Sequence, residues 1–138
     1  MKRICVIDGQ GGGIGSVVIK RLKEALGESV EILALGTNAI ATAQMLKAKA
    51  NRGASGENAI VRTSATADVI IGPISIVLAN SMMGEVTPAM AEAVAGSRAR
   101  KMLLPLTQEN VEVVGNPRLP LPELVDCLLQ EYLKDIIR

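Results

Sequence analysis

The chain has 138 residues, a length that fits one domain, and 49% of them are apolar, which predicts a folded core. A formal net charge of +1 and an aromatic content of 1% argue against a nucleic-acid partner, which needs a basic surface or base-stacking side chains. The absence of histidine excludes histidine-dependent triads and histidine-ligated metals, so we assign no metal ligands. No apolar run approaches the roughly 20 residues of a membrane span, and we expect a cytoplasmic protein.

Apolar runs alternate with helical patterns through the first half of the chain. Continuous apolar runs are typical of strands buried on both faces, and apolar residues at helical spacing indicate amphipathic helices. The elements predicted here are a strand at residues 4–7, a glycine loop at 9–15, a helix at 14–26, a strand at 30–35 and a helix at 38–50 capped by Thr37.

The same alternation continues to the end of the sequence. The predicted elements are a loop at 51–56, a helix at 57–65, a strand at 68–72, a helical stretch at 74–83, a helix opened by Thr87 and Pro88, a strand at 101–106, a short edge strand at 111–114, and a last helix introduced by Pro120 and Pro122 whose apolar stripe includes Tyr132 and Ile136. Strands that alternate with helices predict an α/β fold: a three-layer Rossmann-like sandwich with a mainly parallel sheet of about five strands and helices on both faces. Residues 1–138 are expected to form a single Rossmann-like nucleotide-binding domain.

In such sheets the ligand lies at the carboxyl ends of the strands, near the point where the strand order reverses. Three segments therefore share one predicted rim: residues 8–15, residues 36–38, and the pair Gly72 and Pro73. At this rim the glycine loop lies between a strand and a helix, where free backbone N–H groups favour an anion. The predicted cofactor-binding residues are Gly9, Gln10, Gly11, Gly12, Gly13, Ile14, Gly15, Thr37, Asn38, Gly72 and Pro73.

The loop matches the pattern G-x-x-x-G-x-G through Gly9, Gly13 and Gly15, and so resembles the cofactor loop of short-chain dehydrogenases. The resemblance covers about the first 15 residues and implies an NAD(P)-type cofactor. It stops there, because the Tyr-x-x-x-Lys pair of that family has no counterpart, and Thr37 and Asn38 follow the second strand where an acidic residue would bind ribose. The alternative is a glycine-rich turn that only permits tight packing of strand on helix.

Over its whole length the chain is similar to a family of short, functionally uncharacterised bacterial α/β proteins. That resemblance implies kinship and no established activity. The segments that carry it are residues 6–15, 34–41, 51–59, 68–74 and 79–88.

Two carboxylates are candidates for chemistry. Asp8 ends the first strand beside the glycine loop, where it is either a Mg²⁺ ligand or a local cap on loop N–H groups. Glu85 is the best candidate for a general base, if the protein has one.

Two further polar groups are candidates for substrate binding. Arg52, Ser55 and Asn58 belong to a polar segment that either closes over a ligand, with Arg52 on a phosphate, or serves only to cap the next helix through Ser55. Asn80 and Ser81 form either a wall of the site or an internal hydrogen-bond network.

These residues support three hypotheses. The first is a nucleotide-binding protein in which residues 9–15 hold the phosphates and Thr37 and Asn38 lie near the ribose, with NAD or NADP as the first candidate. The second is a small enzyme acting on a phosphorylated metabolite, with Asp8 or Glu85 as acid or base. The third is a non-catalytic regulatory or assembly subunit. A mean hydropathy of +0.32 suggests that some apolar surface is buried in a homo-oligomer.

Overall fold

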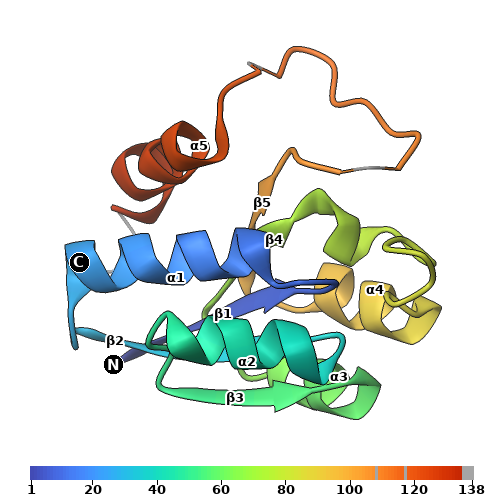
Figure 1. Cartoon of the computed structure of the whole chain (residues 1–138), viewed down its shortest axis with the longest axis horizontal. Helices are drawn as coiled ribbons and strands as arrows, with labels where there is room; N and C mark the ends of the chain where they lie inside the picture. The colour runs from blue at the N-terminus through green and yellow to red at the C-terminus, as the bar shows by residue number, and fades with distance from the viewer. Residues whose placement is uncertain (108, 117, 135–138) are drawn as a thin grey trace.

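A computed structural model describes residues 1–107, 109–116 and 118–134 (Figure 1). The described residues form one five-stranded sheet, all parallel, in the order β3-β2-β1-β4-β5, so the predicted α/β Rossmann-like fold is confirmed. The elements are β1 (Lys2–Asp8), α1 (Gly13–Leu26), β2 (Val30–Gly36), α2 (Ala39–Lys47), β3 (Arg52–Ser55), α3 (Glu57–Ser64), β4 (Val69–Pro73), the 3₁₀ helix η1 (Ile74–Val77), α4 (Pro88–Gly96), β5 (Arg100–Leu104), α5 (Leu121–Cys127) and the π-helix η2 (Leu128–Leu133).

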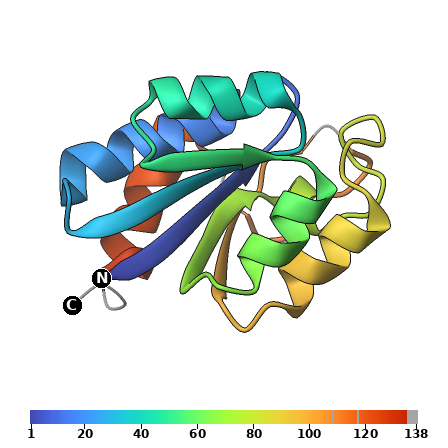
Figure 2. The ribbon, with the colours of Figure 1, turned by 90° about the horizontal axis from the view of Figure 1, so that it is seen from below.

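The central strand β1 is buried on both faces, and its alternate side chains enter two separate cores. Ile4 and Val6 pack with residues of α1, α2 and α5 on one face. Cys5 and Ile7 pack with residues of α3 and α4 on the other. Figure 2 shows these layers, with α1 and α2 on one side of the sheet and α3 and α4 on the other. The continuous apolar run of β1 is therefore explained by its place in the middle of three layers.

The strand order reverses between β1 and β4. The chain runs from β1 outward to β2 and β3, then crosses back to lay β4 on the other side of β1. Asp8 pairs with Gly36 of β2, and Val6 pairs with Ile71 of β4, so the carboxyl ends of these strands lie at one edge of the sheet. The predicted rim is therefore present at a topological switch point.

Residues 51–56 were expected to be a loop, and this expectation is wrong. Arg52–Ser55 form β3, an edge strand paired in parallel with residues 33–36 of β2. All four of its residues are exposed and none is β-branched or aromatic, so no apolar alternation marked it as a strand. Backbone pairing with β2 makes this segment extended.

Two other expectations about elements are also wrong. Residues 111–114 are exposed and form no strand, and within the described residues they pair with none of the five strands. The helical stretch predicted at 74–83 ends as η1 at Val77, and a series of turns follows it. The cap of α2 is Asn38, whose Oδ1 accepts a hydrogen bond from the Ala41 amide, and not Thr37.

The last helix begins as predicted but changes its period. After α5 the chain continues as the π-helix η2, in which each turn takes about one more residue. As a result Leu133, five residues after Leu128, is fully buried, whereas Tyr132 is exposed. Ile136 lies outside the described residues. Within the described part of the chain, none of the helices combines the length and apolarity needed to cross a membrane.

Gly72 provides a test of the sheet packing. A Cβ at Gly72 would lie 2.4 Å from the carbonyl oxygen of Ile7 on the neighbouring strand, a backbone atom that cannot easily move. We expect Gly72→Ala to lower the free energy of unfolding by about 1–3 kcal/mol. The matched control is Gly96→Ala at the end of α4, where a Cβ meets nothing within 4 Å. Because alanine restricts the unfolded chain, the free energy of unfolding of this variant should rise by about 0.4–1 kcal/mol. Urea unfolding measures both; equal effects would contradict the packing.

Candidate functional site

A cavity of about 620 Å³ opens at the switch point, beside the end of β1. This volume lies within the roughly 300–1,000 Å³ typical of small-molecule pockets. Its walls come from the ends of β1 and β4, the start of α1, η1 and the turns after it, and the segment after β5. The lining residues are Asp8, Gln10, Ile14, Pro73, Ser75, Asn80, Met82, Met83, Gly84, Leu106, Thr107 and Glu109. The cavity thus brings together five residues predicted as site residues: Asp8, Gln10, Ile14, Pro73 and Asn80.

Three glycines of the loop are explained by packing alone. A Cβ at Gly9 would lie 2.5 Å from Sδ of Met82, and one at Gly15 would lie 2.5 Å from Sδ of Met45. Gly12 has a φ of 74°, and a Cβ there would lie 2.8 Å from the carbonyl oxygen of Ala41. For these three positions the tight-packing interpretation of the loop is sufficient.

Gly11 and Gly13 are different, because nothing in the fold requires them to be glycine. A Cβ at either position meets no atom within 4 Å, and neither residue has a left-handed φ. Within the described residues, their amides also donate no hydrogen bond, whereas the amides of Gly9, Gly12 and Gly15 all do. Two exposed amides next to the N-terminus of α1 are therefore open to an anion.

The Asp8 carboxylate caps the start of α1. Its Oδ1 accepts a hydrogen bond from the Gly9 amide at 2.8 Å, and its Oδ2 accepts one from the Gly15 amide at 2.7 Å. These bonds are those of the local-cap alternative. Burial raises the pKa of the Asp8 carboxyl above its ordinary value, against the opposing effect of the amide hydrogen bonds. An internal anion thus occupies part of the helix terminus.

Glu85 joins three segments of the rim through one oxygen atom. Oε1 accepts hydrogen bonds from the Gln10 amide at 2.8 Å, the Thr37 hydroxyl at 2.6 Å and Nδ2 of Asn38 at 2.8 Å. Burial raises the pKa of Glu85, but these hydrogen bonds outweigh it and hold the pKa below its ordinary value. A carboxylate whose pKa is lowered and whose Oε1 already accepts three hydrogen bonds is a weak base, so the geometry favours a structural role. We call this arrangement the Glu85 clasp.

The turn that carries Glu85 is held in an unusual conformation. Asn80, Met82 and Met83 all have positive φ values, between 55° and 67°, and Gly84 has a φ of 88°. Left-handed conformations at residues other than glycine cost roughly 1–3 kcal/mol each and concentrate at functional sites. Here the strained residues are the ones that line the cavity, and Met83 is 95% exposed.

Sequence reasoning missed the contribution of the segment after β5. The Ser75 hydroxyl donates to Oγ1 of Thr107 at 3.0 Å, and Oε1 of Glu109 accepts from the Met82 amide at 2.8 Å. Both bonds close the wall of the cavity opposite the glycine loop. The signal was available, since Thr107 and Glu109 follow a strand that ends at the same rim as β1 and β4.

Other predicted residues lie elsewhere. Arg52 forms an ion pair with Glu31 at 3.3 Å. It lines a separate hollow, whose walls include residues of β2, β3 and α3. The Ser55 hydroxyl donates to Thr42 at 2.7 Å, and Gly56 is the N-cap of α3, so the expectation that Ser55 caps this helix is wrong. Asn58 is exposed in the first turn of α3.

Two further predicted residues are buried beside the cavity without lining it. Gly72 lies inside β4, with its neighbour Pro73 at the wall. The buried Ser81 hydroxyl donates to the carbonyl of Ser75 at 2.6 Å, as in the internal-network alternative.

The fold and the site define a doubly wound α/β domain with a cavity at its switch point. A family model described as "Domain of unknown function (DUF3842)" matches residues 3–137, and the chain belongs to this family. The expected kinship with an uncharacterised family is thereby confirmed. A comparison with curated proteins found no match.

Removal of the Glu85 clasp should destabilise the rim. Glu85→Ala leaves three donors without their acceptor, and we expect a loss of about 2 kcal/mol in the free energy of unfolding at pH 7. Glu85→Gln retains an oxygen for the same donors and should lose less. Urea unfolding at neutral pH measures both variants, and a Glu85→Ala variant as stable as wild type would contradict the clasp.

The clasp should also weaken in acid. Because the pKa of Glu85 in the folded state is below its ordinary value of 4.5, its contribution is complete above that value and is lost as the pH falls through the lower, folded-state pKa. The stability difference between wild type and Glu85→Gln should therefore shrink below about pH 4.5. Urea unfolding over this pH range measures the difference, and a difference that grows in acid would contradict the assignment.

Proposed function

We propose that this protein binds a small phosphate-bearing ligand of nucleotide size at the switch point. The observation that carries the proposal is the pair Gly11 and Gly13, whose amides are free and whose lack of side chains the fold does not require. Glycine at such positions lets phosphate oxygens approach the backbone. The ligand body would occupy the adjoining cavity of about 620 Å³, against Ile14, Pro73 and Leu106.

The charges of the lining favour a phosphate that carries a cation. Asp8 and Glu109 line the cavity, and no lysine or arginine does so among the described residues. Within these residues, no three acidic or cysteine side chains gather to hold a metal alone. Mg²⁺ typically takes one or two carboxylates together with phosphate oxygens, which fits this donor set. We therefore propose that Mg²⁺ accompanies the ligand and offsets the charge of the carboxylates.

The spacing of the glycines in the loop is the reason to include nicotinamide dinucleotides among the proposed ligands. Thr37 and Asn38, expected near the ribose, donate to Glu85 instead, so a dinucleotide lying over the end of β2 would have to displace the clasp. A mononucleotide confined to the cavity leaves the clasp intact. The geometry thus favours a mononucleotide over NAD or NADP.

Gly13→Val tests the site without disturbing the fold. A Cβ at residue 13 meets no atom within 4 Å, and the valine side chain would stand before the amide of that residue. In a thermal-shift panel of ATP, GTP, FMN, NAD(H), NADP(H), sugar phosphates and inorganic phosphate, each with and without Mg²⁺, a ligand at 100 times its Kd should stabilise wild type by about 2.7 kcal/mol. We expect the shift to require Mg²⁺ and to vanish in Gly13→Val, while Ala89→Val in the first turn of α4 retains it. A wild-type protein that responds to no member of the panel would contradict the proposal.

A second candidate function, acid–base catalysis on a phosphorylated metabolite, is favoured by Asp8 alone. This carboxyl is 3% exposed, lines the cavity and has a raised pKa, a combination common among catalytic acids. In this alternative Asp8 acts as the acid and holds no Mg²⁺, so with a ligand from the panel as substrate we expect Asp8→Asn to retain ligand binding and to lose turnover. If Asp8→Asn retains turnover, Asp8 serves only to accept hydrogen bonds from the loop amides, and the catalytic role is contradicted.

A further inference from the structure

Within the described residues, no strand pairs with the outer edge of β5, and this edge is predominantly apolar. The Arg100 amide donates to the carbonyl of Asp68, on the β4 side, and the direction of backbone groups alternates along a strand. The backbone N–H and C=O groups of Lys101 and Leu103 therefore point away from the sheet. Lysine often blunts exposed edges, but Nζ of Lys101 is bonded to the carbonyl oxygen of Ser97.

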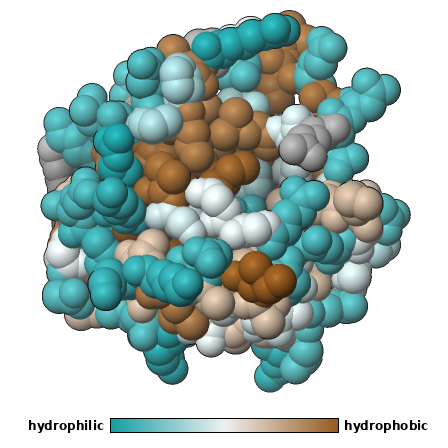
Figure 3. All heavy atoms as spheres, viewed as in Figure 1, coloured by the Kyte–Doolittle hydropathy of each residue, from teal (hydrophilic) through white to brown (hydrophobic). Residues whose placement is uncertain are grey.

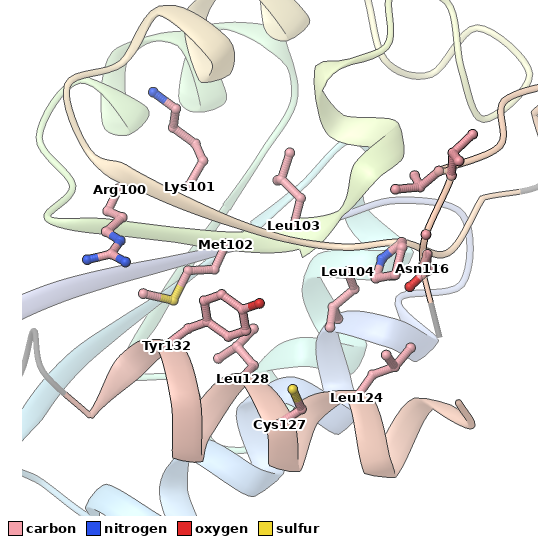
Figure 4. A pocket seen from close by; sticks show the side chains of 14 residues that line it. Arg100, Lys101, Met102, Leu103, Leu104, Asn116, Leu124, Cys127, Leu128 and Tyr132 are labelled. Carbon is pink, nitrogen blue, oxygen red and sulfur yellow. The ribbon is translucent and has the colours of Figure 1, made fainter. Parts of the chain in front are cut away.

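A groove runs along this edge on the face that carries α5. Its volume is about 490 Å³, and its walls are mainly apolar side chains of β5, α5, η2 and the segment before α5. Figure 4 shows Met102 and Leu104 directed toward Leu124 and Leu128 of the helix, with Lys101 and Leu103 on the opposite face of the strand. Figure 3 shows apolar surface gathered between α5 and β5. Val114, at the rim of the groove, is 97% exposed.

A basic residue lines one end of the groove, and two exposed acids adjoin lining residues at the other end. Arg100 lies at the start of β5, next to Tyr132, and the exposed Arg98 precedes it (Figure 4). At the other end, Leu104 lies near Leu124 and Asn116. The exposed acids Glu112 and Glu123 directly precede Val113 and Leu124, which line that end. A partner that fits the groove therefore has an apolar centre, one acidic end and one basic end.

We propose that the partner is a second copy of this chain, paired antiparallel along β5. A two-fold axis at Met102 sets Lys101 of each copy opposite Leu103 of the other. These residues have the outward-facing backbone groups and would exchange two hydrogen bonds in each pair. The same axis brings the basic end of each groove to the acidic end of the other, and Tyr132 of each copy toward Val114 of the other. One symmetric contact thus hydrogen bonds the edge strand, buries the apolar rim and pairs the opposite charges.

The oligomeric state of the full chain tests this interface. Wild type should sediment as a dimer, and Val114→Glu should shift it to monomer, because two desolvated carboxylates would enter the contact. Val114 is almost fully exposed, so the variant should fold normally. The matched control is Ile40→Glu on α2, a 68% exposed apolar residue away from the groove, which should remain a dimer. A monomeric wild type, or a dimer that Val114→Glu leaves intact, overturns the proposal.

Two further variants test the register. Arg100→Glu should weaken the dimer, because in the proposed pairing Arg100 of one copy lies near Glu123 of the other. Adding Glu123→Arg should restore the dimer, since the double variant has the same pair of opposite charges with the signs exchanged. In a Cys127→Ser background, Met102→Cys should form a covalent dimer on mild oxidation, because facing residues at this kind of position have Cα atoms about 4.5 Å apart. Leu103→Cys, which faces Lys101 of the second copy, should not. Failure of both the charge rescue and the Met102→Cys crosslink overturns this pairing whatever ligand the switch point binds.

Discussion

The candidate site depends on how the backbone N–H groups of residues 9–15 are shared. Asp8 accepts from Gly9 and Gly15, and Glu85 accepts from Gln10, so two carboxylates of the chain itself hold most of the loop in place. These internal anions preorganise the loop, since they fix its shape before any ligand arrives. They also restrict the place left for an external anion to the amides of Gly11 and Gly13. A phosphate bound as we propose would therefore lie close to the carboxylate of Asp8, which is the reason for including Mg²⁺ in the proposal.

The sequence predicted the sheet and its helices because their signals are local. The apolar runs of β1 and β4 and the helical stripe of α1 each follow from residues adjacent in the chain. The failures involve segments whose conformation is decided by distant neighbours. Arg52–Ser55 form a strand through their pairing with β2, whereas residues 111–114, despite their strand-forming side chains, pair with none of the five strands in the part of the chain that the structure describes.

The site was predicted in part for the same reason. The rule that ligands lie at the carboxyl ends of strands grouped Asp8, Gln10, Ile14 and Pro73, and the structure brings these four residues to one cavity. Sequence spacing did not show that Glu85, 75 residues after Gln10, accepts from that residue's amide. The left-handed turn at residues 80–84 was equally hidden, because methionine gives no sign of a positive φ. Without that turn neither Glu85 nor Met82 would reach the loop.

The two edges of the sheet differ in composition. The segment that follows the β5 edge also connects the switch point to the β5 groove. The β3 edge consists of Arg-Gly-Ala-Ser, with a glycine and short or charged side chains that make a poor template for a further strand. The β5 edge carries Met102, Leu103 and Leu104 beside an apolar groove. The segment after β5 supplies Thr107 and Glu109 to the cavity and Val113 and Val114 to the groove. A contact made by this segment therefore bears on both, and a dimer formed along β5 would support the wall of the cavity at the switch point.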